Sequence, residues 1–224
     1  MTDLPPLLVL TDRHACERRG SSLAETVEVA VAGGARAFVL REKDLPRERR
    51  RELGEAIASL VRRVGGVLIV ASDPALAGEL GAGWLHLAGA DTWPGGTSRG
   101  GAEGGSRRLT GLAPGGAGRS CHDAASLLRA REEGAAYATL SPVFPSASKP
   151  GYGPPLGVAG LARLVRTVPG LPVYALGGID AGSAAGCRDA GAAGVAAMGA
   201  VMGAARPEVA VRELLASLNA QPAP

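Results

Sequence analysis

The sequence predicts a single (β/α)₈ barrel, and three observations lead to that fold class. The chain has 224 residues, close to the usual length of one such barrel. Eight short apolar runs alternate along the chain with segments of helical periodicity. Most of the 34 glycines and 16 prolines fall between these segments, as is typical of short loops. We therefore expect one domain over residues 1–224.

The first half of the chain contains four of the expected strands. Gly33 and Gly34 end the first helix, and Pro46 stands in the first turn of the second. Asp73 precedes Pro74 and fits the N-cap position of the third helix. The expected strands are 7–10, 37–40, 67–71 and 84–87, and the expected helices are 22–32, 46–64 and 73–80.

The second half continues the alternation and supplies four more strands. Strands joined by crossover helices run parallel, and eight of them close into a barrel; a doubly wound open sheet is the alternative. Residues 93–116 are rich in glycine and predict a flexible loop or lid, and 220–224 predict a tail. The expected strands are 117–120, 136–140, 172–176 and 194–197, and the expected helices are 123–133, 158–168, 181–190 and 207–218.

The composition argues against nucleic acid and membranes as partners of this chain. The net charge is only +3, aromatic residues make up 3%, and Glu48 and Glu52 are interleaved with the arginines of 47–51. This pattern predicts a solvated helix face and no nucleic-acid site. Three widely spaced cysteines predict a reducing cytoplasm, and no apolar run is long enough to predict a membrane span. The sequence allows a homo-oligomer and leaves the oligomeric state open.

Candidate ligand-binding residues follow the ends of the predicted strands, where barrels of this kind carry their active sites. Arg41 and Lys43 are two residues apart, so both side chains point to one face and suit a phosphate or carboxylate. Lys149 adds a third cation in a loop that also contains Ser146 and Ser148.

Two glycine-containing turns follow the seventh and eighth strands. Backbone N–H groups at Gly177, Gly178, Gly199 and Ala200 can approach a phosphate closely, which is the usual phosphate site of this fold. The alternative is that these glycines only form tight turns.

His122 is the natural acid/base candidate, because it follows the fifth strand and imidazole titrates near neutral pH. His86 lies between two leucines inside the fourth strand and predicts a packed barrel histidine.

Seven segments, taken in order, resemble the thiamine-phosphate synthase / TenI family. Each segment is a weak signal alone, but together they extend from residue 7 to about residue 203, each at the end of a predicted strand. They are 7–13 (LLVLTDR), 40–44 (LREKD), 85–91 (LHLAGAD), 118–122 (GRSCH), 141–149 (SPVFPSASK), 172–179 (PVYALGGI) and 194–198 (GVAAM).

The resemblance implies one of two activities. A synthase of this family joins a hydroxymethylpyrimidine diphosphate to a thiazole ethyl phosphate, releases pyrophosphate and needs Mg²⁺. The TenI branch includes a thiazole tautomerase, which moves a proton on the thiazole phosphate carboxylate and needs no metal. Positions that match the family's substrate-binding residues are Arg41, Lys43, Ser120, Lys149, Gly177 and Gly178, and Asp91 matches one metal-binding acid.

Departures from the synthase pattern favour the tautomerase. Val39 replaces a glutamine, Ala71 and Ser72 replace an asparagine and an aspartate, and Gly199 replaces a serine. A missing polar partner weakens recognition of a polar ring, and one carboxylate binds Mg²⁺ more weakly than two.

We therefore expect a metal-independent thiazole tautomerase in which His122, part of a segment similar to the TenI Gly-Arg-Ser-x-His, moves the proton. The alternative is a thiamine-phosphate synthase that uses Mg²⁺ on Asp91. A further alternative is a non-catalytic regulator that binds thiazole or thiamine phosphate.

Overall fold

Eight parallel strands close into a barrel in the computed structural model, which describes residues 4–93, 115–146 and 153–220. Each strand pairs with the next along the chain, and β1 pairs with β8, so the doubly wound open sheet is excluded. The strands are β1 (Leu7–Leu10), β2 (Ala37–Leu40), β3 (Val67–Ala71), β4 (Trp84–Leu87), β5 (Ala117–Cys121), β6 (Tyr137–Leu140), β7 (Val173–Leu176) and β8 (Gly194–Ala197).

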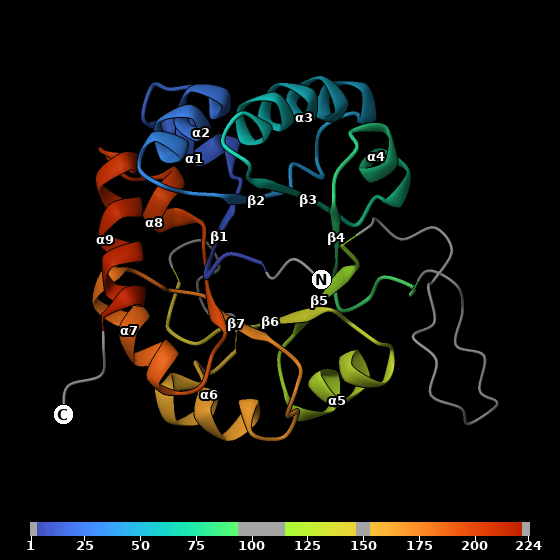
Figure 1. The fold of residues 1–224 in the computed structure, drawn as a ribbon, viewed down its shortest axis with the longest axis vertical. Coiled ribbons are helices and arrows are strands. Elements are labelled where there is room, and N and C mark those ends of the chain that lie inside the picture. Colours follow the sequence, from blue (N-terminus) through green and yellow to red (C-terminus); the bar gives the residue numbers. More distant parts are fainter. Residues whose placement is uncertain (1–3, 94–114, 147–152, 221–224) are drawn as a thin grey trace.

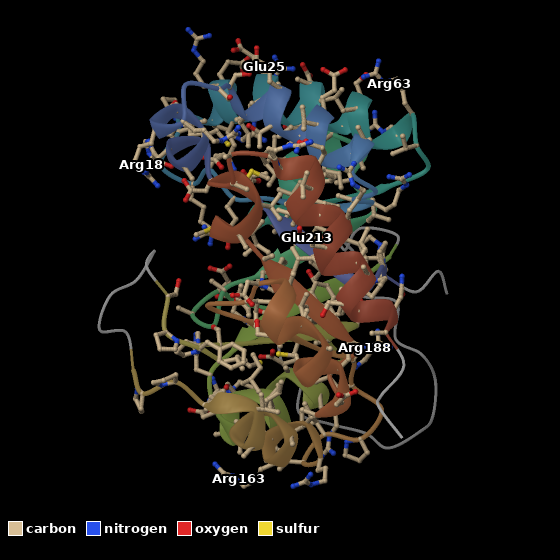
Figure 2. All side chains as sticks on the ribbon, turned by 90° about the vertical axis from the view of Figure 1, so that its left-hand side faces the viewer. Arg18, Glu25, Arg63, Arg163, Arg188 and Glu213 are labelled. Atoms are coloured by element: carbon tan, nitrogen blue, oxygen red, sulfur yellow. The ribbon has the colours of Figure 1, made fainter. Side chains whose placement is uncertain are left out.

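Helices surround the strands as an outer layer (Figure 1). Charged side chains such as Arg18, Arg63 and Arg163 project from this layer into solvent (Figure 2). None of the helices in the described ranges is long and apolar enough to cross a membrane. The helices are α1 (Arg13–Arg18), α2 (Leu23–Ala32), α3 (Arg47–Arg62), α4 (Pro74–Glu79), α5 (Ala124–Glu132), α6 (Gly157–Val165), α7 (Ala181–Asp189), α8 (Gly199–Met202) and α9 (Pro207–Asn219).

Strand periodicity divides the core in two. Along β1, Leu7 and Val9 pack outward against the helices, whereas Leu8 and Leu10 point into the barrel. The interior cluster is rich in aromatic rings on one side, where Tyr137 meets Trp84 and Tyr174 edge-on. This cluster fills the interior of the barrel, as is typical of a fold whose active sites lie at the carboxyl ends of the strands.

The basic stretch of α3 is only partly the solvated face that the sequence predicts. Arg51 pairs with Glu48 and Glu55 on the exposed side of the helix. Arg50, in contrast, is buried, and its guanidinium donates to the carbonyl oxygens of Leu40, at 3.2 Å, and Ala71, at 2.6 Å. The prediction is wrong for Arg50, which ties α3 to the ends of β2 and β3.

Two short helices are additional to the predicted elements. In α1, the Asp12 carboxylate accepts a hydrogen bond from the Ala15 N–H, and α8 starts directly after β8. Most of the predicted flexible loop, residues 94–114, and most of the predicted tail lie outside the described residues. A single domain over the whole chain stays a prediction.

Candidate active site

A cavity of about 950 Å³, here called the central cavity, opens at the carboxyl ends of the strands. Its inner wall is partly apolar, with Leu10, Val39 and Ala71 from β1, β2 and β3. Ser148 and Lys149 lie outside the described residues. The predicted site residues that line the cavity are Arg41, Lys43, Ser120, His122, Ser146, Gly177, Gly178, Gly199 and Ala200.

A charged network lies beside the cavity at the ends of β2, β3 and β4, and of its three residues Lys43 lines the cavity whereas Ser72 and Asp91 lie behind that lining. The Lys43 ammonium donates to the Ser72 hydroxyl oxygen at 2.6 Å, and the Ser72 hydroxyl donates to the Asp91 carboxylate. The Asp91 carboxylate also accepts the Ala88 N–H at 2.7 Å. Ser72 adopts a φ of 59°, a left-handed conformation that is uncommon for a residue other than glycine. Lys43, Ser72 and Asp91 therefore form one connected unit.

Asp91 stays ionised within this network. Burial alone would raise the pKa of its carboxyl group, but the hydrogen bonds from Ser72 and Ala88 and the charge of Lys43 bring the pKa below its usual value. Asp73, the other acid nearby, caps α4 by accepting the Leu76 N–H at 2.8 Å. Asp73 also lies 3.6 Å from the buried Arg50 guanidinium, so it is committed to the helix cap and to this ion pair.

Arg119 anchors the β4 loop, residues 88–93, which carries Asp91. Its buried guanidinium donates to the carbonyl oxygens of Ala88, at 2.9 Å, and Asp91, at 2.6 Å. The same group pairs with Glu133 at 2.6 Å and lies over the Trp93 ring, 5.2 Å from its centroid. Arg119 is not among the predicted site residues; the available signal is a charged residue in the middle of a predicted strand.

Arg41 lies between the two sides of the cavity. Its backbone N–H donates to the Thr11 hydroxyl at 2.9 Å, which fixes the end of β2 against β1. Its guanidinium reaches the Met198 sulfur at 2.8 Å, at the end of β8. Glu42 turns away from the cavity, and its carboxylate is bound by Arg13 at 3.0 Å. The alternation expected at residues 41–43 is therefore present.

The opposite side of the cavity is built from the turns after β6, β7 and β8. Gly177 and Gly178 have φ values of 97° and 64°, which side chains disfavour. A Cβ at Gly178 would overlap the Pro145 carbonyl oxygen, so the glycine lets the two turns pack together. A Cβ at Gly199 would meet no heavy atom of the described residues within 4 Å. Gly178 thus serves the turn, and Gly199 faces open space in the cavity.

His122 lies at the rim of the cavity beside the β6 turn. Its Nδ1 lies 2.8 Å from the Ser141 carbonyl oxygen, and a carbonyl can only accept, so Nδ1 carries a hydrogen. Its backbone N–H donates to the Ser126 hydroxyl at 3.0 Å. These contacts set the ring orientation from its Nδ1 side.

His86 is buried at the base of the cavity, as the sequence predicts. Its Nδ1 lies 2.9 Å from the Tyr137 hydroxyl and its Nε2 lies 2.9 Å from the Ser120 hydroxyl. Burial, together with the positive charges of Lys43 and Arg41, lowers the pKa of His86 to about 4. The ring is therefore neutral at physiological pH.

Relatives that align over most of this chain carry the name of a thiamine-phosphate synthase. A sequence profile of the family described as thiamine monophosphate synthase matches residues 7–201. Relatives named thiamine-phosphate synthase from Roseiflexus castenholzii and Thermus thermophilus are 38% and 36% identical to this chain. These alignments cover 92% and 88% of this chain and 85% and 91% of the relatives. A solved thiamine phosphate pyrophosphorylase from Pyrococcus furiosus has a TM-score of 0.77 at 28% identity and covers 95% of this chain and 94% of its own.

The expected TenI-type tautomerase is wrong, because these relatives carry the name of the synthase, a transferase, and not of an isomerase. The losses at Val39, Ala71 and Ser72 remove single polar groups. Lys43, Ser72 and Asp91 nevertheless remain joined by hydrogen bonds, so the charged side of the cavity persists. With a family profile that extends over the whole barrel, this chain belongs to the thiamine monophosphate synthase family.

Proposed function

We propose that this chain joins hydroxymethylpyrimidine diphosphate to thiazole ethyl phosphate and releases pyrophosphate. The observation that carries the proposal is one cavity of about 950 Å³ that is lined by two cationic side chains and by two glycine-containing turns. Arg41 and Lys43 suit a diphosphate on one side, and the turns at Gly178 and Gly199 suit a monophosphate on the other. A cavity of this size can hold two small ligands at once.

The coupling needs charge stabilisation and positioning, not proton transfer. The bond between the pyrimidine methylene carbon and the diphosphate oxygen breaks, and its electron pair leaves with pyrophosphate. The lone pair of the thiazole nitrogen forms the new carbon–nitrogen bond, so that nitrogen becomes cationic and no proton is exchanged. Arg41 and Lys43 would stabilise the negative charge that develops on the leaving group.

A magnesium ion fits this arrangement as a companion of the diphosphate. Protein sites hold Mg²⁺ through one or two carboxylates together with substrate phosphates. Asp91 is an ionised carboxylate beside the Ser72 hydroxyl, and these two residues would hold the ion. The described residues contain no group of three or more acidic, histidine or cysteine side chains that could hold a metal. When bound, the ion supplies positive charge to the leaving pyrophosphate.

His122 has no acid/base task in this reaction. We propose instead that it contacts the thiazole half of the cavity, where Ser141 fixes its ring. Ser120 and Ser146 would bind substrate from the cavity wall. The three buried cysteine thiols agree with the cytoplasm that the sequence predicts.

Replacing Asp91 tests the proposal. Asp91→Asn keeps the size of the side chain and removes its charge, so kcat/KM for Mg²⁺-dependent pyrophosphate release should fall at least about tenfold. The Mg²⁺ concentration that gives half the maximal rate should rise in the same variant.

Asp12→Asn is the control, because the Asp12 carboxylate caps α1 and is not part of the cavity lining, and asparagine caps a helix as well as aspartate does. It should release pyrophosphate at the wild-type rate. Equal Mg²⁺ dependence of the Asp91→Asn and wild-type proteins would contradict the proposal.

A further inference from the structure

Three side chains from neighbouring strands form a hydrogen-bonded chain that ends in the central cavity. The Tyr137 hydroxyl of β6 lies 2.9 Å from Nδ1 of His86. Nε2 of His86 lies 2.9 Å from the Ser120 hydroxyl of β5. Thr139 lies near the same nitrogen, at 3.5 Å. Of these four residues, His86, Ser120 and Thr139 line the cavity. Tyr137 is not part of the lining and contacts the cavity wall only through His86.

Packing fixes the geometry of this chain. Tyr137 is 1% exposed, and its ring stacks on His86 with centroids 5.4 Å apart and planes 27° apart. Trp84 and Tyr174 close against Tyr137 edge-on, at centroid distances of 6.0 and 5.7 Å. Gly118 leaves the space that the Tyr137 ring occupies. The two rings therefore have one arrangement available to them.

The direction of the hydrogen bonds follows from the tyrosine. Burial raises the pKa of Tyr137 well above its usual value, so its hydroxyl keeps its hydrogen. Among the described residues, Nδ1 of His86 is the acceptor within reach of that hydrogen. If His86 donated from Nδ1 instead, the buried tyrosyl hydrogen would lose its acceptor, which is unfavourable.

We infer that Tyr137 donates to Nδ1, that the hydrogen of neutral His86 resides on Nε2, and that Nε2–H donates to Ser120. With a lone pair of its oxygen engaged by His86, Ser120 presents its own hydrogen to the cavity. Tyr137 and His86 are then positioning residues that make Ser120 a donor. The cavity accordingly selects a ligand atom that has a lone pair and no hydrogen, such as a ring nitrogen or a phosphate oxygen.

The tautomer of His86 can be measured without any ligand. The chain has three histidines, so ¹⁵N-histidine labelling gives three rings, which His14→Gln and His122→Gln variants assign. At pH 7 His86 should show a protonated Nε2 and an unprotonated Nδ1. The reverse tautomer would overturn the inference. This measurement does not depend on the proposed function, so a failure of activity and a failure of the chain of hydrogen bonds are distinguishable.

A double-mutant cycle tests the consequence for recognition, which rests on the proposed function. Tyr137→Phe removes the donor to His86 and should weaken binding of thiamine phosphate, measured by calorimetry, about fivefold. In a Ser120→Ala background the same change should have less than about twofold effect, because the donor it positions is gone.

Tyr174→Phe is the control for loss of a hydroxyl inside the barrel, since Tyr174 donates to the Leu4 and Pro5 carbonyls, away from His86. It should leave binding of thiamine phosphate unchanged. Equal effects of Tyr137→Phe with and without Ser120 would contradict the positioning role.

Discussion

Arg50 and Arg119 are the two buried arginines of the described residues, and both have partners distant in the sequence. Arg50 binds carbonyl oxygens at the ends of β2 and β3, and Arg119 binds Glu133 and the β4 loop. A local pattern of interleaved arginines and glutamates predicts a solvated face because it contains no information about such carbonyls. These residues could be placed only once the barrel had closed.

At the residue scale, Gly178 and Gly199 should respond differently to alanine. Gly178→Ala places a side chain at a φ of 64° and against the Pro145 carbonyl, so it should destabilise the fold by about 2 kcal/mol or more. The expected fall in Tm is roughly 4–8 °C.

Gly199→Ala is the matched variant, because its Cβ enters open space. Its Tm should stay within about 2 °C of wild type, but its affinity for thiazole phosphate should fall. Thermal unfolding and calorimetry measure the two effects. Equal Tm values for both alanine variants would contradict this account of the turns.

The neutral state of His86 predicts how stability depends on pH. The pKa of the folded protein is about 4, whereas that of an unfolded histidine is about 6.5. Below pH 6.5 the unfolded state binds the proton first, so the free energy of unfolding should fall between pH 6.5 and 4, by on the order of 3 kcal/mol.

Urea unfolding at several pH values measures this loss. His86→Gln should flatten the dependence between pH 6.5 and 4, and His14→Gln, at an exposed position, should not. An unchanged pH profile in the His86→Gln protein would show that the ring is not held neutral.

At the scale of elements, the strands are the most predictable part of the chain. Five of them, including β1 and β8, have the predicted bounds. Their apolar runs are short, and most have a polar, glycine or proline residue on at least one side, which marks where the strand begins or ends. Helix ends differ from the predicted bounds by up to three residues, and α1 and α8 were not predicted. Both are short and lack an apolar period. The Asp12 cap sets the start of α1, whereas α8 has no side-chain cap and packs against α1 and α9.

The β4 loop depends on the pair of Arg119 and Glu133. Arg119→Met would leave the Glu133 carboxylate, only 10% exposed, without its partner and should cost about 3–5 kcal/mol of stability. Replacing both residues by methionine should recover part of that loss, since no buried charge remains.

Arg206→Met is the control, because Arg206 and Glu208 form an exposed pair. It should change stability by less than about 1 kcal/mol. If the double variant were no more stable than Arg119→Met, the buried pair would not be the cause. Chemical denaturation measures all three variants.

For the whole molecule, barrel closure assembles the site. Lys43 follows β2 and Asp91 follows β4, and the Ser72 hydroxyl between them completes the network. The sequence predicted which residues gather at the carboxyl ends, but not the hydrogen bonds among them. The single polar groups absent at Val39, Ala71 and Ser72 are therefore a poor guide to the branch of the family.

The most direct test of the proposed coupling is to follow both products at once. Purified protein is mixed with hydroxymethylpyrimidine diphosphate, thiazole ethyl phosphate and Mg²⁺, and pyrophosphate and thiamine phosphate are quantified together. The account predicts equal amounts of the two products, and none when either substrate is omitted. If folded protein bound both substrates but formed no thiamine phosphate, the account would be contradicted.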